Sequence, residues 1–204
     1  MNREALESGT ADHGITWQVL QDYDYEVERE FYLIATRGTG RHISVDEICD
    51  SMDEFDAALK AERIVYSQPL FMLAHSGVSV SLGGFNDPWD SGQCGFACIT
   101  KETADLFGLL PDDYESFLKS AVDTYNAYLI GNVIGYCIEQ TKKCDSCGHT
   151  SEEHLDSCWG FVITRGWGGM DEFVKDTVMP QVQYFVDKFN EAEHQAEKGV
   201  KSDD

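Results

Sequence analysis

Cysteine and histidine residues gather between positions 144 and 158. Their spacing, C-x2-C-x6-H-x3-C, supplies four candidate metal ligands: Cys144, Cys147, His154 and Cys158. A C-x2-C turn presents two thiolates to one ion, and a third cysteine and a histidine complete a tetrahedral zinc site. His149 could replace His154 as the nitrogen ligand. The spacing therefore predicts a structural zinc site, although the same residues also fit a polar loop with free thiols or a redox-active C-x2-C pair.

A second set of reactive side chains centres on His75 and Asp90. His75 lies in the link between two predicted strands and Asp90 lies in the loop after the second of them, so the two could meet across a sheet. Residues that could act as nucleophile or assist are Ser76, Ser91, Gln93 and Cys158. A site of His75, Asp90 and Cys158 would support acyl transfer or hydrolysis. The sequence has no Gly-x-Ser-x-Gly elbow, and a polar network that fixes the two turns fits the same residues.

Acidic residues greatly outnumber basic ones. The chain has 37 Asp and Glu against 15 Lys and Arg, a formal net charge of −22. This excess disfavours direct binding to nucleic acid or to an anionic membrane, because both are polyanions. It favours a basic protein partner or cations, or it serves solubility and protects sheet edges.

Five carboxylates alternate along one segment: Asp22, Asp24, Glu26, Glu28 and Glu30. In an extended chain they face one side at intervals of about 6.8 Å, on the order of the phosphate spacing in nucleic acid. A predicted helix after Ser44 adds Asp46, Asp50 and Asp53 on its outer face. The pattern predicts a surface that imitates nucleic acid and binds a basic groove.

Apolar periodicity predicts an α+β fold, a mostly antiparallel sheet with three or four helices packed on it. Strands are predicted within residues 15–36 and at 63–73, 78–82, 94–99, 132–139 and 155–163. Helices are predicted to begin at Ser44, where Ser44 and Glu47 have capping-box spacing, and to span 101–107, 112–129 and 171–196. Pro180 should kink the last helix or start a new segment.

No repeat or low-complexity linker divides the chain, so we expect a single domain over residues 15–198, with a Cys/His hairpin loop at 140–158. Residues 1–14 and 199–204 are polar and are expected to be flexible. No secretory segment opens the chain and no apolar run approaches the length of a membrane span. We therefore expect reduced cysteines and a cytoplasmic location.

Three islands, residues 73–81 (LAHSGVSVS), 88–96 (PWDSGQCGF) and 156–161 (DSCWGF), resemble a family of uncharacterised proteins carried by bacteriophages and other mobile elements. The likeness covers about half of the chain, from Val65 to Phe161. The family has no assigned activity, so the resemblance implies no residue roles. It implies a phage context, in which small acidic proteins often block restriction or CRISPR effectors and several mimic nucleic acid.

Charge and resemblance together predict an acidic phage-type protein that binds and inhibits a nucleic-acid-binding defence factor in the cytoplasm of an infected bacterium. One alternative is a small hydrolase or transferase with the His75, Asp90 and Cys158 site. Another is an accessory phage protein with no inhibitory role. The aromatic content of 12% is compatible with a homodimer.

Overall fold

The computed structural model describes residues 5–35, 39, 42–49, 51–60, 63–144, 146–164 and 168–200. The chain divides into two compact units, where the sequence predicted a single domain over residues 15–198. The terminal unit combines residues 1–25 with 133–204, and the central unit comprises residues 26–132. Each unit has its own sheet and helices, which confirms the α+β class.

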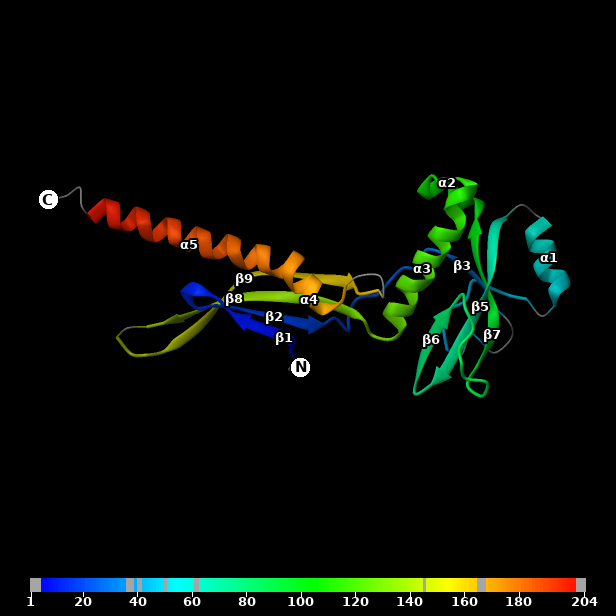
Figure 1. Cartoon of the computed structure of the whole chain (residues 1–204), viewed down its shortest axis with the longest axis horizontal. Coiled ribbons are helices and arrows are strands. Elements are labelled where there is room, and N and C mark those ends of the chain that lie inside the picture. The colour runs from blue at the N-terminus through cyan, green and yellow to red at the C-terminus, as the bar shows by residue number, and fades with distance from the viewer. Residues whose placement is uncertain are drawn as a thin grey trace. The chain divides into compact units, whose positions relative to one another are not determined.

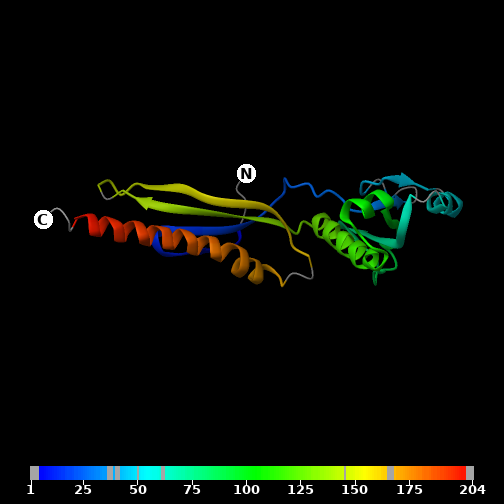
Figure 2. The same ribbon diagram turned by 90° about the horizontal axis from the view of Figure 1, so that it is seen from above.

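The terminal unit is a four-stranded antiparallel sheet with one long helix along it (Figures 1 and 2). Its strands, in spatial order, are β1 (Ala5–Thr10), β2 (Ile15–Gln21), β8 (Val133–Lys143) and β9 (Thr150–Val162). The helical stretch comprises α4 (Met170–Phe173), the π-helix η4 (Val174–Val178) and α5 (Met179–Val200). The backbone stays helical from α4 through η4 into α5, and the change from π- to α-helical turns comes at Met179, one residue before Pro180.

Alternation along the strands builds the core of this unit. Every second residue of β2 and β8 is buried against the helix, which contributes residues mostly four positions apart. The members are Ile15, Trp17, Val19, Ile134, Tyr136, Ile138, Phe173, Val174, Val178, Val182 and Val186.

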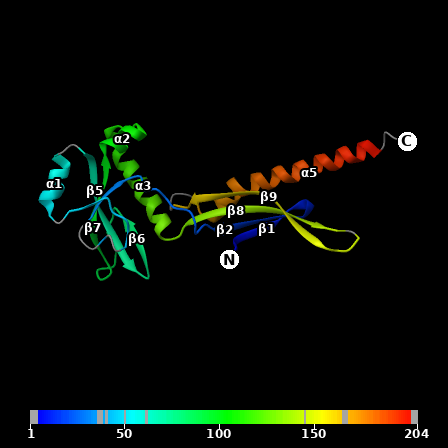
Figure 3. The ribbon, with the colours of Figure 1, turned by 180° about the vertical axis from the view of Figure 1, so that it is seen from behind.

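The central unit is a five-stranded sheet covered by helices on both faces (Figures 1 and 3). Its strands are β3 (Tyr32–Ala35), β4 (Glu47–Ile48), β5 (Ile64–His75), β6 (Gly77–Ser81) and β7 (Ser91–Thr100), in the order β4-β3-β7-β5-β6. Among the described strands of this unit, only β3 and β4 pair in parallel. The helices are α1 (Met52–Lys60), α2 (Lys101–Phe107) and α3 (Tyr114–Leu129).

Successive residues of β3 and β7 enter two different cores. Leu33 and Ile99 pack with α3, whereas Ile34 and Cys98 pack with α1. This alternation places α1 and α3 on opposite faces of the sheet. None of the described helices is long and apolar enough to cross a membrane.

Several local predictions differ from the structure. Helix α1 begins at Met52, not at Ser44, and Glu47 lies in β4. The cap is formed by Ser51, whose Oγ accepts a hydrogen bond of 3.3 Å from the N–H of Glu54. The N-terminal segment predicted to be flexible contains β1. The predicted Cys/His hairpin loop at 140–158 is mostly strand, because β8 continues to Lys143 and β9 begins at Thr150.

Candidate functional site

The alternating acidic segment is not a strand, and it crosses from one unit to the other. Asp22 and Asp24 belong to the terminal unit, where the N–H of Asp24 donates to Oδ1 of Asp22 at 3.2 Å in a local turn. Glu26, Glu28 and Glu30 belong to the central unit and are exposed. Within the central unit, these three exposed carboxylates alternate with the less exposed Val27 and Arg29.

Between the three glutamates, side chains point inward. Val27 and Arg29 are half-buried and Phe31 is buried. The Arg29 guanidinium donates to the carbonyl oxygens of Phe31, at 3.0 Å, and of Ser44, and it pairs with the Asp46 carboxylate. It also lies 5.4 Å and 5.7 Å from the ring centres of Phe31 and Tyr125. We call these contacts of Arg29 with Phe31, Ser44, Asp46 and Tyr125 the Arg29 clip. The clip fixes the segment and keeps Glu26, Glu28 and Glu30 directed outward.

The other acidic candidates have different surroundings. Asp46 Oδ2 accepts a hydrogen bond of 2.7 Å from the N–H of Leu33 and also pairs with Arg29. These internal contacts engage the carboxylate of Asp46. Asp53 is exposed on α1, on the sheet face opposite α3. Asp50 lies outside the described residues. Of the described candidates in the central unit, Asp53 therefore lies on the sheet face away from α3, and Asp46 is engaged by Arg29.

Two hollows border the segment within the central unit. One, of about 580 Å³, lies between the segment, residues 42–46 and helix α3. The other, of about 310 Å³, is lined by Glu28 and Glu30 together with Leu106 and Phe107 of α2. Leu106 is 79% exposed and Phe107 is 46% exposed. Carboxylates and exposed apolar side chains thus share one hollow, which we call the acidic face.

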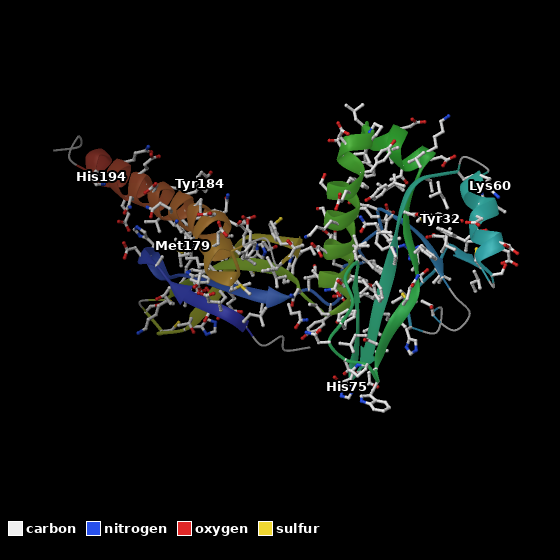
Figure 4. The ribbon with its side chains drawn as sticks, turned by 45° about the vertical axis from the view of Figure 1, so that its right-hand side comes forward. Tyr32, Lys60, His75, Met179, Tyr184 and His194 are labelled. Atoms are coloured by element: carbon white, nitrogen blue, oxygen red, sulfur yellow. The ribbon has the colours of Figure 1, made fainter. Side chains whose placement is uncertain are left out.

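His75 and Asp90 do meet, as predicted. His75 projects from the end of the β5–β6 hairpin (Figure 4), and its Nδ1 lies 2.5 Å from Oδ2 of Asp90. Asp87 caps the following turn by accepting N–H bonds from Asp90, at 3.0 Å, and Trp89, at 2.9 Å, and these bonds lower the pKa of the Asp87 carboxyl. Ser91 Oγ donates to the carbonyl oxygen of Asp87.

The surroundings of this pair do not resemble a catalytic cleft. The side chains of His75 and Asp90 are 72% and 39% exposed, so water has free access to both. The hydroxyl of Ser91 is committed to the Asp87 carbonyl oxygen, and Gln93 donates to the carbonyl oxygen of Gly95 at 3.4 Å. Cys158 lies on β9 of the terminal unit. The pair ties two neighbouring turns together, as the polar-network interpretation predicts.

The Cys/His hairpin separates its predicted ligands. Cys144 and Cys147 lie at the tip, but strand register places His154 opposite Glu139 and Cys158 opposite Tyr136. Lys143 and Thr150 form the last pair of the hairpin, so Cys158 lies eight residues along β9 from its tip. At about 3.3 Å per residue, that separation exceeds any reach to a common metal ion. The structure does not bring the four residues together.

The thiols differ in their chemistry. Hydrogen bonds from the Ser146 hydroxyl and the Cys147 thiol, and then from the backbone N–H groups of both residues, lower the pKa of Cys144 to about 6. Burial instead raises the pKa of Cys94 to about 11 and that of Cys98 to about 12. Cys144 is therefore the strongest candidate nucleophile or metal ligand among the thiols, and the buried pair is inert.

Two of the three islands named above form turns and the third forms a β-bulge. The first two contain His75 and Asp90, and the turn in the second island is capped by the preceding residue, Asp87. In the third, pairing with β8 shifts register, and a Cβ on Gly135 would lie 2.3 Å from the ring of Trp159. Comparisons with protein-family models, with curated proteins and with solved structures found no match.

Sequence reasoning missed the residues that build the acidic face. Arg29 is a lone basic residue between Glu28 and Glu30, and a cation inside an acidic run is a usable signal for an internal ion pair. Leu106 and Phe107 end a helix whose apolar residues gave no sign of exposure. Only the packing of α2 beside the segment shows that the two features adjoin.

Proposed function

We propose that this chain is a binding protein whose acidic face occupies the nucleic-acid groove of a basic protein. The observation that carries the proposal is the hollow shared by Glu28, Glu30, Leu106 and Phe107. A cation alone would need only carboxylates, whereas exposed apolar side chains beside them suit a protein surface. The net charge of −22 favours rapid, salt-sensitive association with a basic partner.

The spacing of the carboxylates supports mimicry of a nucleic acid. Glu26, Glu28 and Glu30 are exposed at alternate positions of an unpaired segment, and extended backbone puts such neighbours about 6.6–6.8 Å apart. The resemblance of the three islands favours a phage context. In that context the partner is a host defence factor of restriction or CRISPR type, bound in the cytoplasm of an infected bacterium.

A matched pair of variants tests the proposal. Glu26→Gln, Glu28→Gln and Glu30→Gln together remove three charges from the segment that lines and borders the acidic face. Glu152→Gln, Asp176→Asn and Glu191→Gln remove three exposed charges from the terminal unit. The tagged chain and both variants are used to capture proteins from a bacterial host lysate at low and high salt, with duplex DNA as competitor.

The expected result is a basic nucleic-acid-binding protein retained by the wild type and by the terminal-unit variant at low salt. DNA or high salt should displace it, and the acidic-face variant should fail to retain it. Leu106→Ala should weaken the same complex about tenfold, because a buried leucine side chain contributes about 1.5 kcal/mol. Equal retention by both charge variants would refute the acidic face as the binding site.

A further inference from the structure

The turn η1 (Asp12–Gly14) between β1 and β2 holds the side chain of His13 against helix α5 of the same unit. Its Nε2 lies 2.9 Å from Oδ1 of Asn190, and its Nδ1 lies 3.4 Å from Oε1 of Glu193. The ring also packs on that of Phe189, with 5.9 Å between the ring centres. The side chain of His13 is only 16% exposed. One histidine thus contacts three residues on one side of the helix.

The backbone of this turn is built around His13. His13 has a φ of +59°, and it is the only non-glycine residue with a positive φ in the described part of the chain. Its carbonyl oxygen accepts a hydrogen bond of 3.0 Å from Nε2 of Gln140, whose side chain is buried. At Gly14, which has a φ of +69°, a Cβ would lie 2.6 Å from the carbonyl oxygen of Thr141. Non-glycine residues in this conformation persist where the surroundings hold them, and they gather at ligand sites and switches.

The apolar contacts of α5 with the sheet end at the same place. Val186 is the last buried residue of the helix among the side chains that the structure describes, and Phe189 is the last half-buried one. Residues 190–195 are exposed. A helical end without a packed face frays readily. The polar contacts of His13 with Asn190 and Glu193 therefore extend the attachment of α5 by about one turn.

Both ring nitrogens of His13 face an oxygen atom that accepts hydrogen bonds. A neutral imidazole donates from one nitrogen and accepts at the other, whereas an imidazolium donates from both. If Nε2 donates to Asn190, the neutral ring directs the lone pair of Nδ1 at the carboxylate of Glu193. Protonation of Nδ1 turns this contact into an ion pair. Histidine is the side chain that ordinarily changes its charge between about pH 5 and pH 8.

We propose that His13 is a pH-sensitive latch, which holds the C-terminal part of α5 on the sheet when the ring is charged and loosens it when the ring is neutral. The sign follows from the ion pair with Glu193, which exists only at the lower pH. The contribution of the latch is therefore present at low pH and is lost as pH rises through the range in which histidine titrates. The proposal does not depend on the acidic face.

The charges around the ring agree with this direction. The charged and titratable groups on the elements that flank it are Asp12 of η1, Glu139 and Lys142 of β8, Glu153 of β9, and Glu193 and His194 of α5. Lys142 pairs with Glu153. Glu139 lies on the sheet face away from α5, because its neighbour Ile138 packs against the helix. His194 Nδ1 lies 3.3 Å from the carbonyl oxygen of Asn190 within the helix. Asp12 and Glu193 remain, and both attract a charged ring.

The test measures hydrogen exchange of the full-length chain at about pH 5.5 and pH 7.5, corrected for the intrinsic exchange rates. We expect the protection of residues 190–195 to fall about two- to fivefold from the lower to the higher pH, in the range of one exposed ion pair. His13→Asn keeps a residue type that tolerates a positive φ but carries no charge, so it should abolish this pH dependence. His194→Gln, a change at an exposed histidine of the same helix, should retain it.

Glu193→Gln separates the ion pair from the shape of the turn. The side chain of Glu193 is 68% exposed, so this change leaves the fold intact, and it decides the question if His13→Asn disturbs the turn. The variant should lose the pH dependence while keeping the contact of His13 with Asn190. Equal protection of residues 190–195 at both pH values in the wild type would overturn the proposal. A pH dependence that survives in Glu193→Gln would overturn it as well, because another group would then be responsible.

Discussion

Replacement of Arg29 by Met tests the structural basis of the acidic face. Methionine keeps most of the length and apolar stem of arginine but removes its charge and its donors. The side chain of Arg29 is only 10% exposed, and its guanidinium serves Phe31, Ser44 and Asp46 at once. The variant therefore leaves two carbonyl groups and one carboxylate without this partner.

The expected cost follows from these contacts. Removal of one member of a fully buried ion pair costs about 3–5 kcal/mol. Asp46 remains 33% exposed and can take up water, which lowers the cost, and the hydrogen bonds of a charged group contribute about 1.5–3 kcal/mol. We expect Arg29→Met to destabilise the central unit by about 2–3 kcal/mol.

Arg63→Met is the matched control. Arg63 pairs with Glu47, the residue next to Asp46, but at 3.6 Å and with a side chain that is 54% exposed. Exposed pairs of this kind contribute about 0–1 kcal/mol. The two variants remove the same chemical group from the same unit. The difference between their losses in unfolding free energy therefore reports the effect of burial and of several simultaneous hydrogen bonds.

Alkylation of Cys98 is a suitable assay. Tryptophan fluorescence would report poorly on the central unit, because Trp89 is 92% exposed. Cys98 has no exposed surface, so it reacts only when the unit opens. A loss of 2–3 kcal/mol corresponds to an acceleration of about 30- to 150-fold at Cys98, against less than about fivefold for Arg63→Met. Equal acceleration in the two variants would refute the argument that Arg29 anchors the segment.

Two further predictions concern packing and pH. Gly135→Ala places a Cβ 2.3 Å from the ring of Trp159, so it should lower the free energy of unfolding by about 2–3 kcal/mol. Gly92→Ala is the control, because a Cβ there meets no atom within 4 Å and should leave stability unchanged. Urea unfolding measures both variants. The contribution of Cys94 and Cys98 to stability should be complete below about pH 9 and be lost as pH rises through 11–12, because burial raises the pKa of both thiols above the ordinary value of 9.0 that they have in the unfolded chain. An unchanged urea midpoint between about pH 8 and pH 11 would contradict the second prediction.

The elements that could be predicted from the sequence are those with local signals. Helix α2 spans residues 101–107 as predicted, because Thr100 caps its N-terminus through a 3.1 Å bond to the N–H of Thr103 and Gly108 ends it. Helix α1 was misplaced because Ser44 and Ser51 both precede a glutamate by three residues. Helix α1 begins after Ser51 because Glu47 and Ile48 pair with β3 as strand β4. Such a pairing leaves no local pattern in the sequence.

The division into two units could not be predicted for the same reason. The terminal unit depends on pairs such as Ile15 with Gln140, which join the two ends of the chain. No linker composition marks the boundaries near residues 25 and 132, since the first lies inside the acidic run. The predicted site residues show the same contrast between local and long-range information. The contact of His75 with Asp90 followed from strand order, whereas the separation of Cys158 from Cys144 depends on a hairpin register that spacing alone does not determine.

The positions of the three islands bear on where function lies. Their residues build a tight hairpin end, a capped turn and a bulge, and each has a structural reason for its residue types. Residue types that turns and a bulge explain constrain the backbone and leave the activity open. Glu26, Glu28 and Glu30 lie outside the islands and have no comparable role in packing, because all three side chains are exposed. The exposed carboxylates of Glu26, Glu28 and Glu30 are therefore the residues on which the proposed binding function depends.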